Sequence, residues 1–346
     1  MKCFVTGATG FVGANLAHVL AAGGHQVKVL LRTPANAGVL KGVAHEVVQG
    51  DLLDTQLLER ELKDCDWCFH VAASYHLWMR DYAPMYESNV TGTRNVLKAA
   101  GKAGCKRIVY TSTVGCIGLK PAGPGPRRPA TEEDAMAPGQ LSNHYKKSKY
   151  QAECVALDLW RQDRLPIVIV NPSAPVGPMD AKPTPTGRVI VDFLNLKMPA
   201  YLDTGLNWVH VRDVAAGHVL AAQKGRLGER YILGNADGNW TMKETLGMLR
   251  ELSGRPSPSF KIPYWLALAA AAGNEAFSSM TGIPPRAPLA GVRMARYTMW
   301  FDPGKAIREL GLPQTPPKAA FADAIQWFIQ NGYVKNAGSS GSREAA

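Results

Sequence analysis

Three glycines near the N-terminus constrain the fold of this chain more than any other feature. They lie in Thr6–Gly13, between a short apolar run and a segment with helical spacing from Phe11 to Ala22. Glycines at these positions allow a tight turn, let a backbone approach a pyrophosphate, and permit close packing of helix on strand. The amides at a helix N-terminus also attract negative charge. We therefore expect a dinucleotide to bind here rather than an ordinary glycine turn, through Gly7, Thr9, Gly10, Phe11, Val12 and Gly13.

Apolar runs alternate with helical patterns through the first half of the chain. The runs lie at residues 2–5, 27–31, 46–49, 67–73, 107–111 and 165–170. Such alternation predicts an α/β fold with a parallel sheet covered on both faces, here a Rossmann-type doubly wound sheet. Beyond about residue 175, helices punctuated by proline predict a smaller, mostly helical C-terminal lobe that binds the substrate.

These patterns predict a division of the chain into parts. We expect a nucleotide-binding domain over residues 1–175, to which segments around 205–235 return, and a substrate lobe over 176–335. The last residues, 336–346, are small and polar, which favours a disordered tail.

Composition narrows the class of partner. Hydrophobic residues make up 46% of the 346 residues and charged residues 19%, as in globular proteins. The 39 Lys and Arg exceed the 28 Asp and Glu, for a formal charge of +11. That charge suits nucleic acid, an anionic membrane surface or a phosphate-bearing ligand. The basic residues are scattered and lack the interleaved aromatics of a single-strand binder, so we expect no nucleic acid. A small-molecule substrate is expected, and a homodimer is left open.

The sequence predicts neither a secretory signal peptide nor a membrane-spanning helix. Gly7–Gly13 interrupts any apolar stretch of a signal peptide. The apolar segment Tyr264–Ala272 is far shorter than the roughly 20 residues of a spanning helix. We expect a packed helix there, with peripheral contact to an anionic membrane as the alternative.

Six cysteines are too few for a disulfide framework in a chain of this length. Cys65 and Cys68 form a lone C-x-x-C with no second pair at zinc-ligand spacing, so no metal site is expected. They flank a run that reads as a buried strand. Core thiols in the reduced state indicate a cytoplasmic protein.

The end of the second strand bears on cofactor choice. NAD-binding folds place an acid there for the ribose 2′-hydroxyl, whereas an Arg suits a 2′-phosphate. No Asp or Glu lies between Leu30 and Val43, and Arg32 follows the strand. We therefore expect NADP to be preferred and NAD to remain an option, with a solvated loop arginine as the alternative for Arg32. Asp51, after the third strand, is placed for the adenine end of the cofactor.

A tyrosine and a lysine suggest acid–base chemistry. Tyr145 and Lys149 are four residues apart, on one face of a predicted helix. A nearby ammonium favours the phenolate and would lower the pKa of Tyr145 toward neutrality. Thr111-Ser112-Thr113 closes the fifth strand, where a hydroxyl could bond the reacting oxygen.

Together these motifs resemble a known family. The glycine turn, Asp51, His70–Ala73, Asn89, the hydroxyl cluster, the Tyr145/Lys149 pair and Asn171-Pro172-Ser173 follow the order found in extended short-chain dehydrogenases/reductases. The chain is most similar to the dihydroflavonol-4-reductase-like branch. Residues 170–178, 182–188 and 198–207 resemble the bacterial hopanoid-associated sugar epimerases.

The resemblance implies roles for individual residues. Tyr145 would be the acid/base and Lys149 its partner that also binds the ribose, with Thr113 as the catalytic hydroxyl in preference to Ser112. Further cofactor contacts would come from Leu52, Ala72, Ala73, Pro172 and Ser173. Apart from the resemblance, His76 and Trp78 follow the fourth strand beside the expected nicotinamide, where they either shape the substrate pocket or serve packing. Lys182 and Arg188 are candidates to hold an anionic or polyol substrate, and Asn171 is a further candidate substrate contact.

The resemblance also defines the reaction class. It implies hydride transfer at a secondary alcohol or ketone carbon, in a reductase or a sugar epimerase of hopanoid lipid biosynthesis. Related dehydratases have Asp-Glu after the hydroxyl, where this chain has Val114-Gly115, so dehydration is not expected. A non-catalytic NADP(H) sensor on the same fold is the alternative, although a sensor would be expected to lack the Tyr or the Lys.

Overall fold

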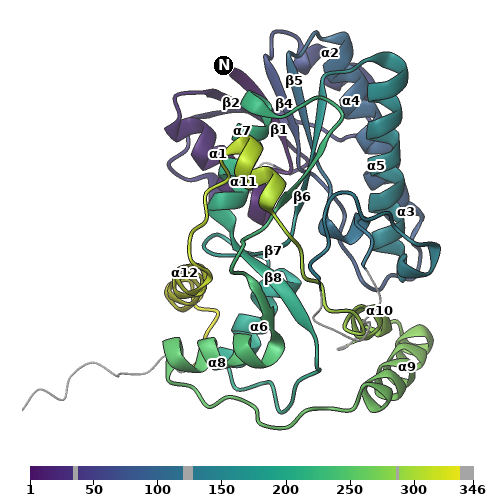
Figure 1. The fold of residues 1–346 in the computed structure, drawn as a ribbon. Coiled ribbons are helices and arrows are strands. Elements are labelled where there is room, and N and C mark those ends of the chain that lie inside the picture. Colours follow the sequence, from purple (N-terminus) through teal and green to yellow (C-terminus); the bar gives the residue numbers. More distant parts are fainter. Residues whose placement is uncertain (34–37, 120–127, 286–287, 336–346) are drawn as a thin grey trace, which may run out of the picture.

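Seven parallel strands form the centre of the fold (Figure 1). The computed structural model describes residues 1–33, 38–119, 128–285 and 288–335, so the predicted tail lies outside the described residues. In spatial order the strands are β3 (His45–Gln49), β2 (Gln26–Leu31), β1 (Lys2–Thr6), β4 (Trp67–His70), β5 (Arg107–Thr111), β6 (Ile167–Pro172) and β9 (Arg230–Leu233). The first six follow the order of the Rossmann fold. The predicted doubly wound sheet is confirmed.

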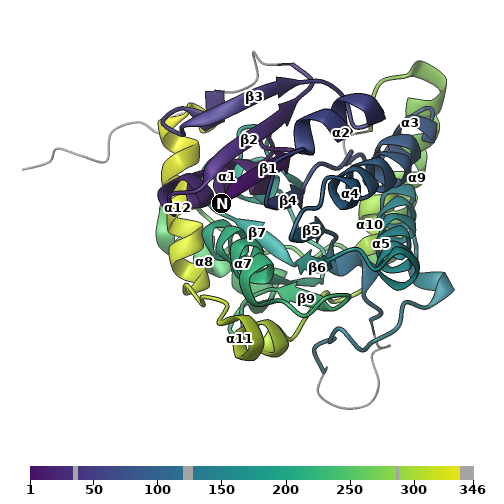
Figure 2. The ribbon, with the colours of Figure 1, turned by 90° about the horizontal axis from the view of Figure 1, so that it is seen from above.

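Helices cover both faces of this sheet (Figure 2). One face carries α1 (Phe11–Ala22), α7 (Val211–Lys224) and α11 (Gly304–Leu310). The other carries α2 (Thr55–Leu62), α4 (Gly92–Lys102) and α5 (His144–Asp163). The short helix α3 (Ala83–Tyr86) leads through a π-helical turn over Glu87–Thr91 into α4.

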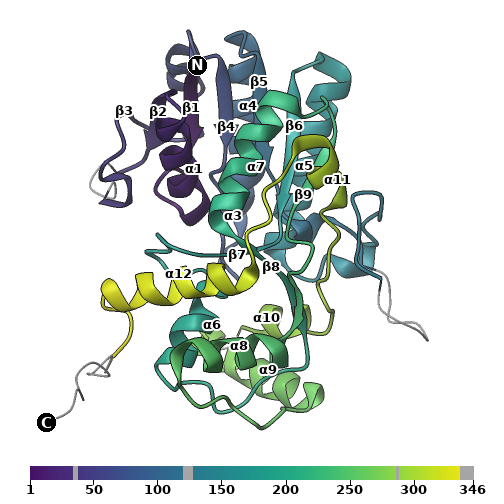
Figure 3. The ribbon, with the colours of Figure 1, turned by 60° about the vertical axis from the view of Figure 1, so that its left-hand side comes forward.

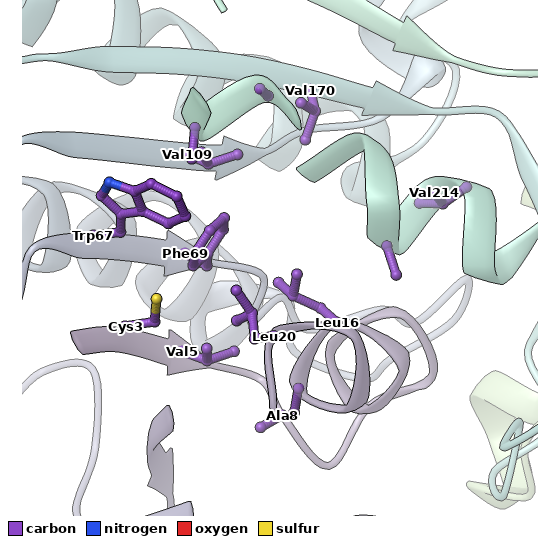
Figure 4. Packing of buried hydrophobic residues seen from close by; sticks show 14 of the residues in the cluster. Cys3, Val5, Ala8, Leu16, Leu20, Trp67, Phe69, Val109, Val170 and Val214 are labelled. Atoms are coloured by element: carbon purple, nitrogen blue, oxygen red, sulfur yellow. The ribbon is translucent and has the colours of Figure 1, made fainter. Parts of the chain in front are cut away.

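Two hydrophobic cores result, one on each face of the sheet. Successive strand residues point to opposite faces, so Val5 of β1 packs toward α1 and α7 while its neighbour Phe4 packs toward α2, α4 and α5. Figure 4 shows the first core, where Leu16 and Leu20 of α1 lie near Phe69 of β4. The strands are therefore almost wholly apolar, which is why their runs are legible in the sequence.

A smaller lobe lies beyond the carboxyl ends of the parallel strands (Figures 1 and 3). It contains a three-stranded sheet of β10 (Asn239–Thr241), β8 (Gly205–His210) and β7 (Ala174–Val176). Its helices are α6 (Pro185–Leu194), α8 (Met242–Ser253), α9 (Tyr264–Thr281), α10 (Leu289–Met294) and α12 (Pro317–Gln330). A third core, which includes Trp208 and Phe321, joins α6, α8 and α12 to this sheet. In parallel α/β proteins, ligands bind at the carboxyl edge that this lobe faces.

Two elements from the second half of the chain belong to the seven-stranded sheet and its covering helices rather than to the lobe. Strand β9 pairs with β6, in register from Ile169 with Arg230 to Pro172 with Leu233. Helix α7 packs against α1. The chain therefore crosses between the two parts more than once, which couples the sheet to the lobe.

Candidate active site

The glycine turn is shaped by close contacts that exclude larger residues. Gly7 has a φ of +74°, and a Cβ there would lie 2.6 Å from the Ala72 nitrogen. A Cβ on Gly13 would lie 2.1 Å from the Gly7 carbonyl oxygen. These distances are far below van der Waals contact, so the turn, the start of α1 and the end of β4 fit together only with glycine at both positions.

The start of α1 has free hydrogen-bond donors. Its N-cap is Gly10, which has no side chain to cap the helix, and its first turn holds no acidic residue. The amides that follow, of Phe11, Val12 and Gly13, lack intrahelical acceptors and lie at the positive end of the helix dipole. This combination fits the pyrophosphate of a dinucleotide, since a phosphate can accept these bonds without steric conflict.

The other predicted cofactor residues lie at neighbouring strand ends. Ala72 follows β4, and its backbone N–H donates to Thr6 Oγ1 (3.2 Å). Pro172 ends β6 and is buried, while Ser173, half-buried, donates its N–H to the Leu233 carbonyl (3.1 Å). Ala73 is exposed. The residues predicted to bind the cofactor thus lie where β1, β4 and β6 end, and their contact with it stays a prediction.

An arginine and an aspartate lie at the strand ends where the sequence predicts the adenine end of the cofactor. Arg32 directly follows β2, is exposed, and makes no ion pair within the described part of the chain. Asp51 follows β3, and its carboxylate accepts the Leu53 N–H (3.0 Å). Arg32 is therefore available to a phosphate group.

Leu52 turns its side chain away from the predicted cofactor site. The side chain belongs to the core between α2, α4 and the sheet, and packs against Gly92 of α4. Its carbonyl accepts a hydrogen bond from Asn95 Nδ2 (3.1 Å). A contact between Leu52 and the cofactor, which stays a prediction, would therefore be made by the backbone.

Tyr145 and Thr113 come together from two elements. Asn143 caps α5 by accepting the Lys146 N–H (2.8 Å), which places Tyr145 in the first turn of the helix. Thr113 follows β5, and its Oγ1 accepts the Gly115 N–H (3.1 Å). The Thr113 hydroxyl lies close enough to the Tyr145 phenol to lower the pKa of that phenol.

Ser112, the alternative hydroxyl, points elsewhere. It is buried, and its Oγ donates to Cys116 Sγ (3.5 Å). Thr113, by contrast, is partly exposed beside Tyr145. The geometry therefore favours Thr113 as the hydroxyl that reaches a substrate.

Lys149 lies one turn after Tyr145 and is deeply buried. Its Nζ donates to the Thr111 carbonyl (2.8 Å) and lies 4.6 Å from the centre of the Tyr110 ring. Burial lowers the pKa of Lys149 to about 8.

The pKa of Tyr145 differs from the prediction. Burial raises this pKa above its usual value, the nearby Tyr75 raises it further, and the nearby Thr113 hydroxyl lowers it. The expectation that Lys149 brings this pKa toward neutrality is wrong for the protein without cofactor, because desolvation of the phenolate outweighs other effects. Tyr145 therefore holds its proton at neutral pH.

Tyr75 is a site residue that the sequence reasoning missed. Its ring centre lies 4.3 Å from that of Tyr145, at an angle of 59°. It follows β4 in the loop that also carries His76 and Trp78. Only its place beside those two residues could have indicated it, because no motif marks it.

Asn171 does not face a substrate. It is fully buried, and its Nδ2 donates to the Thr113 carbonyl (3.0 Å) and to Glu153 Oε2 (2.9 Å). Glu153 in turn pairs with Arg230 (3.2 Å). The predicted substrate contact is wrong, because the Asn171 side chain is fully buried, and its hydrogen bond instead fixes the backbone of Thr113.

The four other residues predicted to contact the substrate lie in two places, the loop after β4 and the region of α6. His76 is exposed and Trp78 half-buried, both in the loop after β4. Lys182 is exposed before α6, and Arg188 is exposed on α6, where its charge acts on the buried Asp180. Their contact with a substrate stays a prediction.

A pair of substitutions distinguishes the two hydroxyls. We expect Thr113→Val to lower turnover by about a hundredfold, the usual effect of removing one preorganised donor to a developing oxyanion. Ser112→Ala should stay within about threefold of the parent, because Ser112 bonds only to Cys116. Steady-state kcat for both variants, with Thr113→Ser as the hydroxyl-retaining control, tests this ranking. The reverse ranking would refute it.

The charge of Lys149 predicts a pH dependence of cofactor binding. Its pKa of about 8 means that the free protein loses this charge as the pH rises through 8. We expect the Kd for NADPH to rise above that pH, by up to about tenfold per unit, because binding then requires proton uptake. Fluorescence titration should show this rise in the parent and in the exposed control Lys147→Met, but not in Lys149→Met. A flat parent profile would contradict it.

Comparisons with known proteins extend these observations. A family model described as "NAD dependent epimerase/dehydratase family" matches residues 3–234. A protein of Synechocystis sp. named "Putative dihydroflavonol 4-reductase" is 47% identical over 96% of both chains. "Sterol demethylase protein B" of Methylococcus capsulatus is 34% identical over 96% of this chain and 100% of its own.

A solved structure agrees with these relatives. The crystal structure of gox2253 is 41% identical, covers 96% of this chain and 99% of its own, and superposes with a TM-score of 0.83. The family model spans the glycine turn, Thr113, Tyr145 and Lys149. This chain belongs to the NAD-dependent epimerase/dehydratase family, the extended short-chain dehydrogenases/reductases.

Proposed function

We propose that this protein is an NADPH-dependent reductase of the cytoplasm that converts a ketone into a secondary alcohol. The observation that carries this proposal is that the Thr113 hydroxyl lies beside the Tyr145 phenol and lowers its pKa. The pair lies at the carboxyl edge of the sheet, where β1 ends in the uncapped glycine turn. Lys149, one helical turn from Tyr145, completes the group.

The reaction divides between cofactor and protein. When bound, the nicotinamide supplies the hydride that reduces the carbonyl carbon. Tyr145 donates its phenolic proton to the carbonyl oxygen, and the Thr113 hydroxyl hydrogen-bonds that oxygen as negative charge develops on it. Lys149 would hold the nicotinamide ribose hydroxyls. Since burial keeps Tyr145 protonated, the free protein is prepared to act as an acid, which is the role that reduction requires.

We assign the selectivity for the ribose 2′-phosphate of NADP(H) to Arg32. Its exposed guanidinium, free of ion pairs among the described residues, follows β2 where NAD-specific proteins place an acid. It can form charge-assisted bonds to a ribose 2′-phosphate. This supports NADP(H) over NAD(H).

The substrate proposed is a polycyclic isoprenoid ketone of the sterol or hopanoid class. Two relatives support this choice, since one is named a reductase and the other is named for sterols. The aromatic ring of Tyr75 beside Tyr145, with Trp78 in the same loop, is compatible with an apolar substrate. An epimerase would use the same residues twice, first as a base and then as an acid.

Cofactor consumption tests the proposal. Purified protein is mixed with stoichiometric NADPH and a series of sterol and triterpenoid ketones, and the loss of NADPH absorbance and the products are followed. We expect net oxidation of NADPH with formation of one alcohol. In a parallel mixture of NADP⁺ and a related alcohol, formation of the epimeric alcohol with no net accumulation of NADPH would identify an epimerase. Tight NADPH binding with no turnover of any ketone or alcohol tested would favour the sensor.

A further inference from the structure

Helix α9 exposes an unusual concentration of large apolar side chains. Trp265 is 69% exposed, Phe277 56% and Met280 86%. Phe260, just before the helix, is 63% exposed, and Ile283, just after it, 61%. Surface apolar residues are usually scattered singly, and a contiguous group of this size marks a contact surface.

The solvent-facing side of α9 also lacks charge. Its exposed positions include Ala269, Ala270, Gly273 and Ala276 in addition to Leu266 and the residues above. The one charged residue of α9 is Glu275, which is half-buried and accepts the Leu289 N–H of α10 (3.1 Å). A surface helix normally turns its polar face to water. Here the face turned to water is apolar, so we define the residues Phe260, Trp265, Leu266, Phe277, Met280 and Ile283 as the α9 face.

The α9 face lies at the outer end of the lobe, far from the parallel sheet (Figures 1 and 3). Arg80, in the loop after β4, lies against Gly282 at the end of the helix, and Leu77 lies near Gly291 of α10. That loop also carries Tyr75, which contacts Tyr145. The α9 face is thus connected through one loop to the candidate active site.

The surroundings of the α9 face are basic. Arg80, Arg293 and Arg296 are exposed and make no ion pair with described residues. Lys261 is exposed before the helix and pairs with Asp203 (2.7 Å). The chain as a whole carries a formal charge of +11. An anionic surface would be attracted by these free arginines and by the net charge.

We propose that the α9 face docks on the surface of an anionic membrane. Trp and Phe side chains on a helix with basic flanks are the features that hold a helix in the interfacial plane of a bilayer. No helix within the described ranges is long and apolar enough to cross a membrane, so the contact is peripheral. That this membrane contact delivers a lipid ketone to Tyr145 rests on the proposed function, whereas the docking itself does not.

Charge favours a membrane over a second copy of the chain. In a symmetric dimer the same patch meets itself, which would bring the unpaired Arg80, Arg293 and Arg296 of both copies together. Like charges at such an interface oppose association. Anionic lipid headgroups neutralise the same arginines instead.

Vesicle sedimentation tests the proposal with the full chain. The probes are vesicles of phosphatidylcholine alone and of equimolar phosphatidylcholine and phosphatidylglycerol. We expect sedimentation with the phosphatidylglycerol vesicles, weakened at high salt. The double variant Trp265→Glu/Phe277→Glu should bind at least about a hundredfold more weakly, because two anchoring side chains are lost and two repelling charges are added. The control Leu196→Glu, at a residue 57% exposed after α6, should bind as the parent does.

Further outcomes separate this proposal from its rivals. No sedimentation of the parent with phosphatidylglycerol vesicles would overturn it. So would loss of binding in Leu196→Glu equal to that of the double variant. A parent dimer in analytical ultracentrifugation that Trp265→Glu/Phe277→Glu dissolves, without vesicle binding, would assign the α9 face to self-association. Turnover of a sterol or triterpenoid ketone solubilised in detergent, measured in parallel without vesicles, should be unchanged in the double variant. Its absence in the parent would contradict the proposed function but not the docking.

Discussion

Replacing Tyr145 by Phe is expected to lower turnover by roughly a hundred- to ten-thousand-fold, the range of general acid catalysis. The substitution removes only the phenolic hydroxyl, while the ring contact with Tyr75 at 4.3 Å is kept. The Kd for NADPH should stay within about twofold, because the cofactor contacts assigned to the glycine turn and Lys149 are intact. Single-turnover rates and fluorescence titration measure the two quantities separately.

The control for this substitution lies on the same helix. Tyr150→Phe removes a phenolic hydroxyl from α5, one residue beyond Lys149, and should leave the turnover of the parent nearly unchanged. If Tyr145→Phe kept turnover within a few-fold of the parent, Tyr145 would not be the proton donor. If both variants lost activity equally, the loss would reflect damage to α5.

Replacing Arg32 by Ala is expected to remove most of the preference for NADPH. Hydrogen bonds to charged groups contribute about 1.5–3 kcal/mol each, which corresponds to a preference of about tenfold to a hundredfold. In the parent the difference in Kd between NADPH and NADH should also shrink at high salt, because Arg32 is exposed. Affinity for NADH should be nearly unaffected by the substitution.

Arg60→Ala is a matched control, since Arg60 is an exposed arginine on α2 that pairs with Glu61 (2.9 Å). It should leave the NADPH preference intact. Equal affinity of the parent for the two cofactors would refute the role of Arg32. A preference that Arg32→Ala leaves unchanged would assign the phosphate to another residue.

The sequence predicts those parts of the fold that are determined by residues close together along the chain. The strands are buried on both faces, so their apolar runs are legible, and the glycines of the first turn have no substitute. The helix predicted to carry Tyr145 and Lys149 is observed from His144 to Asp163, capped at its start by Asn143. The apolar run predicts a fourth strand up to residue 73, but β4 ends at His70. The Ala72 N–H donates to the side-chain hydroxyl of Thr6 on β1 and not to a backbone carbonyl of that strand.

The errors in the site come from contacts between distant segments. Asn171 and Leu52 follow the motif order, but only the hydrogen bond of Asn171 to Thr113 and the packing of Leu52 on Gly92 show that both side chains point inward. The pKa of Tyr145 depends on burial by the surrounding fold and on Tyr75 from another loop. Spacing within a helix reports neither of these, so the predicted pKa of Tyr145 is wrong while its catalytic role stays a prediction.

Transfer of deuterium from the cofactor to the substrate tests the central claim most directly. NADPH carrying deuterium at the transferring position of nicotinamide C4 is incubated with a ketone substrate, and the alcohol is examined by mass spectrometry and NMR. The account predicts one deuterium at the new carbinol carbon with the parent protein and almost none with Tyr145→Phe. An alcohol without deuterium, or equal labelling rates in the parent and in Tyr145→Phe, would contradict hydride transfer assisted by Tyr145.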